Sequence, residues 1–406
     1  MAQSLAGLKV LDMSRVIAGP FAAQTLGDLG AEVIKTERPG SGDDLRQMGP
    51  PWLTDENGAE TGDCTIFHTA NRNKRGITLD FTRPEGQALA HRLIAWADVL
   101  IENYKAGTLA RHGLGYDDLK DRYPRLIYCS ITGFGQTGPY APRPGFDTLA
   151  QAMGGLMATT GRRDGTPGEG PTRIGVPISD LLAAKDAVIG ILAALRHRET
   201  TGRGQHLDIA LLDSTVGIML NNAASVLNGG PAFPRSGNDH QMVAPYGAFR
   251  ARDGWLMINL ITDAQFARLA EALDRPDWLA DRRYRDNGAR LEHRDALAAE
   301  IEQALVDRPV VDWIGHLSRH DIPCGPIHEM PETFADPQVQ SRELVVSLPH
   351  AEAGTVRTVA NPVRLSETPP RYDRPAPVLG ADTDSVLREL GLDEEEIAAC
   401  REAGAI

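Results

Sequence analysis

The feature that most constrains the fold is the alternation, in the first third of the chain, of short apolar runs with longer helix-like segments. A helix is expected between the first two runs, from near Pro20 to Gly30, because proline and glycine stand where helix termini prefer them. A second helix, from Pro84 to about Ala97, leads from ITLDF to the third run. Alternation of this kind predicts an α/β fold with a Rossmann-like layer, in which helices cover a parallel sheet. The runs are KVLDM at 9–13, EVIKT at 32–36, DVLIE at 98–102 and LIYCSI at 126–131.

The middle of the chain is more apolar and then changes in composition. Residues 181–198 predict a long, nearly uncharged helix that should be buried, and the strand candidate HLDIAL and a second apolar helix at 211–227 follow it. Residues 228–247 are dense in glycine, proline and asparagine, which is typical of a linker or a long functional loop. Beyond this loop, a strand candidate at 255–260 and several amphipathic helices indicate a separate small α+β unit. These helices are expected near 264–273, 290–306 and 310–320.

The length of 406 residues favours two domains. We assign residues 1–225 to a large Rossmann-like domain and residues 226–325 to a small α+β domain with its linkers. Residues 326–406 are expected to return to the large domain, because a proline-rich segment of different texture begins near residue 323.

Acidic residues outnumber basic ones, with 55 Asp and Glu against 42 Lys and Arg and a net charge of −13. This balance excludes a general binder of nucleic acid or of an anionic membrane. An anionic ligand would therefore need a local cluster of basic residues. Eight candidates gather in the first third, and we expect about half of them to contact such a ligand, while ordinary surface charge accounts for the rest. The eight are Lys35, Arg38, Arg72, Lys74, Arg75, Arg83, Lys105 and Arg111.

The four cysteines lie far apart and form no CxxC pair, so neither a disulfide framework nor a thiolate zinc site is predicted, and no other metal site is expected. The N-terminus lacks an uninterrupted apolar signal core. The longest apolar run, at 187–195, is too short to cross a bilayer. We therefore expect a cytoplasmic protein without a membrane partner.

A dinucleotide site is the first functional alternative for the opening strand, loop, helix and strand. Glu37 closes the second strand, where such a site places an acidic residue for the ribose. The glycines Gly19, Gly27 and Gly30 do not have the G-x-G-x-x-G spacing, and Pro20 occupies the turn. These residues are better explained by their places at the ends of a helix, and binding of NAD or FAD is disfavoured.

Asp180 stands at the start of the long apolar helix and allows two interpretations. Its position alone favours an N-cap, in which the carboxylate accepts backbone N–H bonds at the positive end of the helix dipole. The functional alternative is a reactive carboxylate at the mouth of a buried helix, beside the glycine-rich segments GFGQTG and PGFD, which let a ligand approach the backbone.

Many motifs together resemble the class III (CaiB/BaiF-like) CoA-transferase family, in order and in register from Leu8 to the end of the chain. The resemblance implies a Rossmann-like domain built from both chain ends, an inserted small domain, and a homodimer of two interlocked rings. The motifs are VLDMSRVIAGPFAAQTLGDLGAEVIKTERPGSGDD, ANRNKRGITLDF, ENYKAGTLARHGLGYDDL, YCSITGFGQTGPYAPRPGFDTLAQAMGGLMATTG, GVPISDL, TGRGQHLDIALLD, IPCGPIHEM and FADPQVQSR.

The resemblance also implies a chemistry and a set of site residues. The family's catalytic aspartate falls on Asp180, whose ionised carboxylate would attack an acyl-CoA thioester and pass CoA to a free carboxylic acid through aspartyl anhydride and aspartyl-CoA intermediates. CoA is a substrate here, and no permanently bound cofactor is expected. Backbone N–H groups of the glycine-rich loop would stabilise the oxyanion. The implied CoA contacts are Val16 and Arg38 for adenosine and phosphates, Leu79 beside the adenine, Asn103, Tyr104 and Arg111 along pantetheine and phosphates, Gly135 in the channel-shaping loop, and Asp147 near the thioester.

Departures from the family pattern rank its branches. The racemase branch has a histidine where this chain has Phe146, so a 2-methylacyl-CoA racemase is disfavoured. The formyl-CoA branch has a glycine run where this chain reads RSGNDHQMVAPYG. The nearest resemblance is to transferases that use succinyl-CoA and a dicarboxylate such as glutarate, and Arg72, Arg143 or Arg173 could bind the distal carboxylate. His240 could line the acyl pocket or have no role. An NAD oxidoreductase and a CoA-binding relative without catalysis remain as alternatives of other classes.

Overall fold

The computed structural model describes residues 3–406, and the chain divides into two compact units. The sheet unit comprises the chain up to Gly155, then Gly175–Met219 and Gln340–Ile406. The small unit comprises Leu156–Ile174 and Leu220–Val339. Compared with the expected boundaries, the small unit begins six residues earlier, ends 14 residues later and takes in an additional segment before the long helix.

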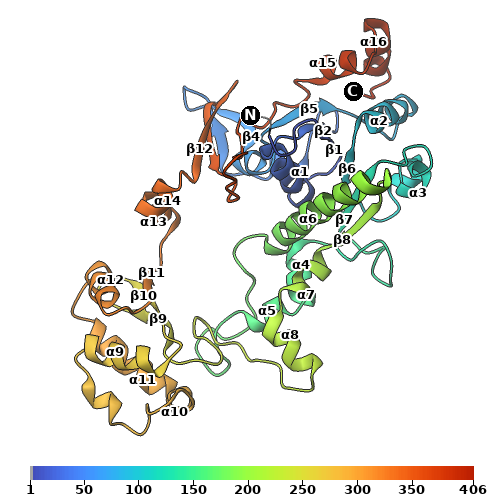
Figure 1. The fold of residues 1–406 in the computed structure, drawn as a ribbon. Coiled ribbons are helices and arrows are strands. Elements are labelled where there is room, and N and C mark those ends of the chain that lie inside the picture. The colour runs from blue at the N-terminus through green and yellow to red at the C-terminus, as the bar shows by residue number, and fades with distance from the viewer. Residues whose placement is uncertain (1–2) are drawn as a thin grey trace. The chain divides into compact units, whose positions relative to one another are not determined.

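A six-stranded parallel sheet forms the centre of the sheet unit, in the order β5-β2-β1-β6-β7-β8 (Figure 1). All four predicted runs are strands in it, and so are ITLDF, in part, and HLDIAL. The chain steps outward from β1 in both directions, so β1 and β6 flank the switch point where α/β sheets bind ligands. The strands are β1 (Lys9–Asp12), β2 (Glu32–Glu37), β5 (Lys74–Thr78), β6 (Val99–Glu102), β7 (Ile127–Thr132) and β8 (His206–Ala210).

Two hydrophobic clusters hold the helices on opposite faces of this sheet. Val10 packs with helices α1 (Ala18–Asp28) and α6 (Ile178–Thr201), whereas the next residue, Leu11, packs with α2 (Pro84–Trp96) and the C-terminal helices. Successive strand residues face opposite sides, which explains the division. The C-terminal helices are α15 (Thr383–Glu389) and α16 (Glu394–Glu402), and both belong to the sheet unit.

The structure corrects two predictions about the apolar helices. Helix α6 is buried only along one face, through residues such as Ala187 and Ile191, while Ile189 on another face is 65% exposed. The expected single helix at 211–227 is two helices, α7 (Leu211–Gly217) and α8 (Leu220–Leu227). Leu220, the first residue of α8, has φ of 35°, which lies outside the α-helical range, so the two helices are not continuous.

The sheet unit also contains several short elements outside its parallel sheet. Two hairpins lie outside the parallel sheet, β3 with β4 and β12 with β13. The remaining bounds are η1 (Asp44–Gln47), β3 (Trp52–Thr54), β4 (Glu60–Cys64), η2 (Thr65–Thr69), η3 (Leu109–His112), α3 (Tyr116–Leu119), α4 (Asp147–Met153), β12 (Val345–His350) and β13 (Gly354–Val359). Helix α14 (Pro337–Ser341) contains the boundary between the two units.

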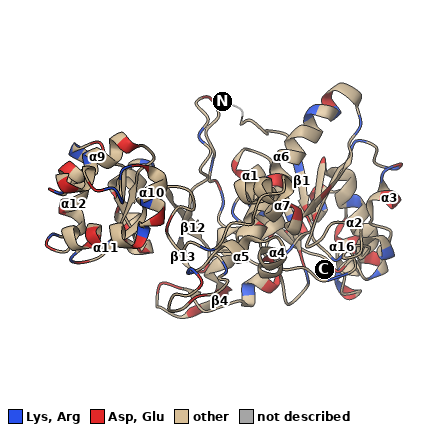
Figure 2. Cartoon of the chain, turned by 90° about the horizontal axis from the view of Figure 1, so that it is seen from below, with Lys and Arg blue, Asp and Glu red and all other residues tan. Residues whose placement is uncertain are grey.

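The small unit is an α+β domain with its own core, as predicted. A three-stranded sheet in the order β11-β10-β9 packs with helices around Phe266, Trp278 and Tyr284. Its helices α9 to α12 carry acidic and basic residues along their lengths (Figure 2). The helix expected at 290–306 is interrupted at His293. The elements are α5 (Leu156–Thr159), β9 (Tyr246–Arg250), β10 (Trp255–Asn259), α9 (Asp263–Ala272), η4 (Pro276–Leu279), α10 (Asn287–Glu292), α11 (Arg294–Leu305), α12 (Val310–Arg319), β11 (Cys324–Pro326) and α13 (Met330–Ala335).

Within residues 3–406, no helix combines the length and apolar character that a membrane span requires. The cytoplasmic location stays a prediction.

Candidate active site

Asp180 lies in the first turn of α6, as its third residue. The N-cap is Pro177, and no side chain caps the helix from that position, so the N-cap interpretation of Asp180 is wrong. The physical reason is that the helix begins at Ile178, directly after the proline, which carries the carboxylate past the cap position. The N–H of Ser179 instead donates to Oδ1 of Asp147 at 2.7 Å. Asp147 therefore satisfies an N-terminal donor of α6 from a neighbouring helix.

The position of Asp147 depends on a contact between two glycines. A Cβ atom built on Gly133 would lie 2.4 Å from Cα of Gly145, and one built on Gly145 would lie 2.3 Å from Cα of Gly133. The loop after β7 and the segment before α4 thus touch backbone to backbone, which only glycine permits. Gln151 completes the arrangement by donating from Nε2 to Oδ2 of Asp147 at 2.7 Å.

The electrostatic environment of Asp180 differs from that of an ordinary surface aspartate. Burial, and then the neighbouring Asp147 carboxylate, raise the pKa of Asp180 to about 7. At neutral pH the group is therefore divided between its acid and carboxylate forms, whereas the sequence led us to expect an ionised group. A carboxyl whose pKa is shifted by burial and by a neighbouring charge is typical of a functional site.

The carboxyl edge of the parallel sheet is the second part of the site. A helix that leads into a parallel strand runs antiparallel to it, so the first turn of α6, which precedes β8, lies toward this same edge. Most of the CoA contacts implied by the sequence follow strands directly, so they line the same edge: Val16 after β1, Arg38 after β2, Leu79 after β5, Asn103 and Tyr104 after β6, and Gly135 after β7. Arg111 lies in η3. Asp147, the first residue of α4, joins this edge through the contact with Gly133.

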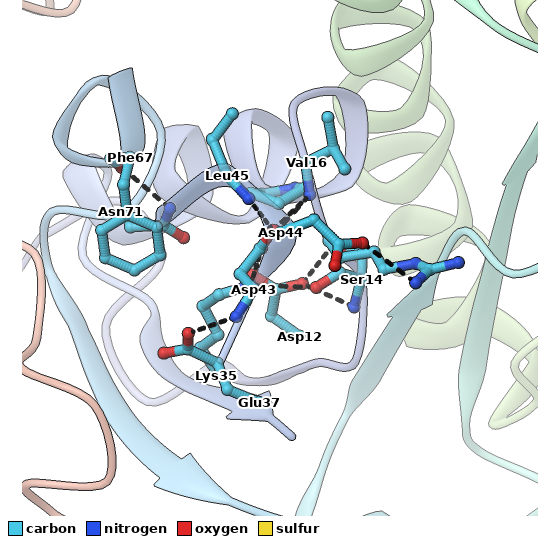
Figure 3. Close-up of polar contacts among 12 residues, drawn as sticks. Asp12, Ser14, Val16, Lys35, Glu37, Asp43, Asp44, Leu45, Phe67 and Asn71 are labelled. Atoms are coloured by element: carbon cyan, nitrogen blue, oxygen red, sulfur yellow. Dashed lines mark hydrogen bonds and ion pairs between the residues drawn. The ribbon is translucent and has the colours of Figure 1, made fainter. Parts of the chain in front are cut away.

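Two buried ion pairs lie next to the loops that follow β1 and β2, and Figure 3 labels the residues of the first pair, Lys35 and Asp43. Nζ of Lys35 donates to Oδ2 of Asp43 at 2.9 Å, and Nζ of Lys74 donates to Oδ2 of Asp12 at 2.8 Å. We call these four residues the ion-pair layer. Their side chains are 0–1% exposed, so Lys35 and Lys74 are not available to a ligand and belong to the part of the basic cluster that was not expected to contact one.

Two further residues from the sequence analysis are also committed to buried pairs. Arg72 makes two hydrogen bonds to Asp28, at 2.9 and 2.7 Å, so it is corrected from a candidate for binding a distal carboxylate to a structural residue. Glu37 makes two hydrogen bonds to Arg46, at 2.7 and 2.8 Å, and is therefore closed to the ribose of a dinucleotide. Both pairs lie in the interior, where removal of one partner leaves an uncompensated charge.

The loop after β1 is held in an uncommon conformation. Val16 has φ of 65°, a left-handed value that is a genuine outlier for a β-branched residue. Its N–H donates to both carboxylate oxygens of Asp43, at 3.0 and 3.2 Å. The side-chain amide of Asn103 accepts from N–H of Arg15 at 2.9 Å and donates to its carbonyl at 2.7 Å. Asn103 thus fixes the switch-point loop, a role that a sequence pattern does not reveal.

The other implied CoA contacts differ in exposure. Arg38 and Arg111 are exposed, whereas the side chain of Leu79 is 3% exposed and belongs to the core. Tyr104 packs against Phe81 with ring centroids 5.3 Å apart, and burial raises the pKa of its hydroxyl to about 12.

The glycine-rich loop after β7 uses part of its backbone internally. The N–H of Gly135, where φ is 85°, donates to Oγ1 of Thr132 at 2.9 Å. The N–H of Gln136 donates to both carboxylate oxygens of Asp208, at 3.1 and 2.9 Å. These two N–H groups are therefore occupied and do not serve as the oxyanion donors that the loop was expected to supply.

The remaining candidates lie on surfaces. Arg143 is exposed, with its guanidinium 4.5 Å from the ring centroid of Tyr140, and Arg173 is exposed as well. In the small unit, Nδ1 of His240 accepts the N–H of Met242 at 3.1 Å, and its ring lies 4.9 Å from that of Tyr246.

One cluster in the described part of the chain resembles a metal site by residue type. Ligand atoms of Asp63, His68 and His350 lie within 4.8 Å of one another. Nδ1 of His350, however, accepts the N–H groups of Glu352 and Ala353 at 3.3 and 3.1 Å, so the proton of the neutral ring lies on Nε2. Asp63 is paired with a guanidinium at 2.8 Å. This donor set does not fit a metal ion.

Comparison with known proteins identifies the family. The family model described as CoA-transferase family III matches residues 5–383. The chain is 43% identical to a succinate–glutarate CoA-transferase of Agrobacterium fabrum, over 95% of each chain, and 38% identical to a human succinyl-CoA:glutarate CoA-transferase, over 99% of this chain and 90% of the relative. A crystal structure of a CaiB/BaiF family protein from Brucella suis has a TM-score of 0.87 at 40% identity and covers 96% of this chain and 100% of that one. The likeness extends over both units, and the chain belongs to CoA-transferase family III.

Proposed function

We propose that the protein transfers CoA from succinyl-CoA to a second dicarboxylic acid such as glutarate, with Asp180 as the covalent nucleophile. The observation that carries the proposal is an aspartate without a cationic partner among the groups that set its pKa, placed in the first turn of α6, a helix that is buried along one face. The substrates are supported by the relatives from Agrobacterium fabrum, human and mouse, which are named as succinate–glutarate or succinyl-CoA:glutarate CoA-transferases.

The first half of the reaction forms an enzyme thioester. The ionised carboxylate of Asp180 attacks the thioester carbonyl of succinyl-CoA, and CoA thiolate leaves as a succinyl-aspartyl anhydride forms. The thiolate then attacks the aspartyl carbonyl of that anhydride. Succinate leaves, and CoA is joined to Asp180 as a thioester.

The second half repeats these steps in reverse with the acceptor. A carboxylate of the acceptor acid attacks the aspartyl thioester and releases the thiolate, which gives an acceptor-aspartyl anhydride. The thiolate attacks the acceptor carbonyl, the new CoA ester forms, and Asp180 regains its carboxylate. No proton is consumed overall, and water must be excluded because each anhydride would hydrolyse.

The carboxyl edge of the sheet binds CoA in this proposal. Arg38 and Arg111 contact phosphates, Tyr104 contacts pantetheine, and Val16 presents its backbone near the adenosine. Leu79 contributes through its main chain, since its side chain is buried. The working form is a homodimer of interlocked chains, which the exposed apolar side chains of α8, including Leu227 at 83%, support.

The experiment that tests the reaction class and the substrates together is a cross panel. Purified protein is incubated with succinyl-CoA, acetyl-CoA or formyl-CoA and, in turn, with glutarate, malate, mesaconate or acetate, and each product CoA ester is identified by mass spectrometry. We expect fast exchange only for pairs of dicarboxylates. Exchange that favours a monocarboxylate would contradict the substrate assignment, and hydrolysis without exchange would contradict the transferase mechanism.

The racemase alternative has its own test. Phe146 is 71% exposed and carries no group that exchanges a proton, so a second base is missing at this position. Deuterium incorporation at the α-carbon of 2-methylacyl-CoA in D₂O, without an acceptor acid, should be far slower than CoA exchange. Deuterium incorporation as fast as CoA exchange between acids would place the protein in the racemase branch.

A further inference from the structure

Two exposed arginines at the switch-point edge share one carboxylate. Nη1 of Arg15, in the loop after β1, lies 3.1 Å from Oδ2 of Asp44, and Nη2 of Arg38, just after β2, pairs with Oδ1 of the same side chain. Asp44 is the first residue of η1. One carboxylate thus bridges two guanidinium groups that come from adjacent strand ends.

The backbone around this bridge is fixed by groups from three other segments. The main chain of Arg15 is bound on both sides by Asn103, and the next residue, Val16, is held in its left-handed conformation by Asp43. Nζ of Lys35 donates to the carbonyl of Ser14 at 2.9 Å (Figure 3). Backbone strain of this kind persists only where the surroundings over-determine it, and it concentrates at ligand sites.

The bridge itself is displaceable, unlike the ion-pair layer below it. The side chains of Arg15, Asp44 and Arg38 are 43%, 46% and 54% exposed. Ion pairs at this exposure contribute little to stability, because water screens them. A phosphate presents more acceptor oxygens and more charge than a carboxylate, and it suits the planar donor fork of arginine. The guanidinium of Arg15 also lies 5.5 Å from the ring centroid of Tyr104, which limits where that side chain can move.

We infer that Arg15 and Arg38 form a clamp for a phosphate group of the CoA ester, and that Asp44 occupies this clamp as an internal anion until the phosphate displaces it. The inference rests on the proposed function, because it takes CoA as the ligand of this edge. It adds Arg15 to the binding residues and gives Asp44 a role that opposes binding. Asp44 then lowers the affinity for CoA and aids release of the product ester.

The test measures binding separately from transfer. Dissociation constants of CoA, dephospho-CoA and adenosine 3′,5′-bisphosphate are measured by calorimetry. The proteins are the wild type, Arg15→Gln and the double variant Arg15→Gln/Arg38→Gln, and each of these three is also measured with Asp44→Asn added. Glu199→Gln is the matched control, since it removes one negative charge from another exposed ion pair with Arg196 in the last turn of α6. A thermal melt confirms folding of each variant.

We expect Asp44→Asn to bind CoA about threefold to tenfold more tightly and Arg15→Gln to bind it about tenfold more weakly, as a removed competitor and a lost phosphate contact require. Glu199→Gln should not change the affinity. In the double arginine variant, Asp44→Asn should no longer tighten binding, because there is no clamp left to free. Loss of discrimination between CoA and dephospho-CoA in Arg15→Gln would assign the clamp to the 3′-phosphate, and retained discrimination would assign it to the diphosphate.

Three results would overturn the inference. Weaker or unchanged binding by Asp44→Asn would show that the carboxylate does not compete with CoA. Tightening that persists in the double arginine variant would mean simple repulsion without a clamp. If all variants bind CoA with the same affinity while the wild type transfers CoA, the inference about the clamp is wrong and the proposed function stands. If the wild type binds no CoA, both the inference and the proposed function are wrong.

Discussion

Asp12 and Asp43, beneath the loops that follow β1 and β2, are more deeply buried than Asp180, yet their pKa values move in the opposite direction. Burial alone would raise the pKa of both, but the ammonium groups of Lys74 and Lys35 outweigh it, and the pKa of each carboxyl falls below its usual range. For Asp180, burial acts together with the Asp147 carboxylate, and the pKa rises to about 7. The comparison teaches that a lysine ammonium in contact with a buried carboxyl can reverse the effect of burial on its pKa, and that Asp180 has no such cation beside it. The ion-pair layer therefore stabilises the loops that follow β1 and β2, whereas Asp180, in the first turn of α6, is the group proposed to react.

The largest effect should come from removing the unpaired carboxylate. Asp180→Asn is expected to lower the rate of CoA exchange between acids by more than about 10³-fold, because the covalent route is lost. Its thermal midpoint should stay within about 2 °C of the wild type, since no ion pair breaks. Asp186→Asn, farther along the same helix, is the control and should retain activity. If a folded Asp180→Asn variant exchanges CoA at a near-normal rate, Asp180 is not the nucleophile.

Breaking a buried pair should instead cost stability. Lys74→Met leaves Asp12 charged and unpaired in the interior, so we expect the free energy of unfolding to fall by about 3–5 kcal/mol. Arg38→Gln, which breaks an exposed pair, should cost less than about 1 kcal/mol. Urea unfolding followed by circular dichroism measures both. Equal losses in the two variants would show that burial does not separate these ion pairs as we describe.

The pH dependence of the rate sharpens the same comparison. Because the pKa of Asp180 is raised to about 7, its ionised fraction grows as the pH rises, and kcat/KM should increase with a midpoint near pH 7. The sign is opposite for stability: the contribution of this group to folding falls as the pH rises from its unfolded pKa of about 4 toward 7, since the fold penalises the charged form.

Asp147→Asn is the variant that tests the cause of this shift. Its amide oxygen can still accept the N–H of Ser179, so the helix terminus is preserved while the repelling charge is removed. The midpoint of the kcat/KM profile should therefore move to lower pH. An unchanged midpoint would mean that burial alone sets the pKa of Asp180.

The smallest effect is expected at the rim of the site. Arg111 is exposed and makes one long hydrogen bond, to Thr108 at 3.4 Å. Arg111→Ala should raise KM for the CoA ester about threefold and leave KM for the free acid unchanged. Unchanged kinetics for both substrates would return this residue to ordinary surface charge.

The sequence was informative where function depends on local pattern. The strands at 9–13 and 32–36 follow from β-branched and apolar runs, and the small unit follows from its helical periodicity. The motif GVPISD placed Asp180 at the start of a helix. The position of that carboxylate relative to the cap was not predictable, because a shift of two or three residues in the helix start decides it and sequence patterns do not locate helix ends so closely.

The sequence alone determined the main strands of the parallel sheet, the position of the small unit in the chain and the family, because these depend on patterns of residues close together in the chain. Only the tertiary structure decided which charges are available to a ligand. Lys35 and Arg38 stand three residues apart with the same charge, but one is buried against Asp43 and the other is exposed beside Asp44. The availability of a charged group is set by the partners that distant segments bring to it and by the water they exclude, and neither is written in the neighbouring residues.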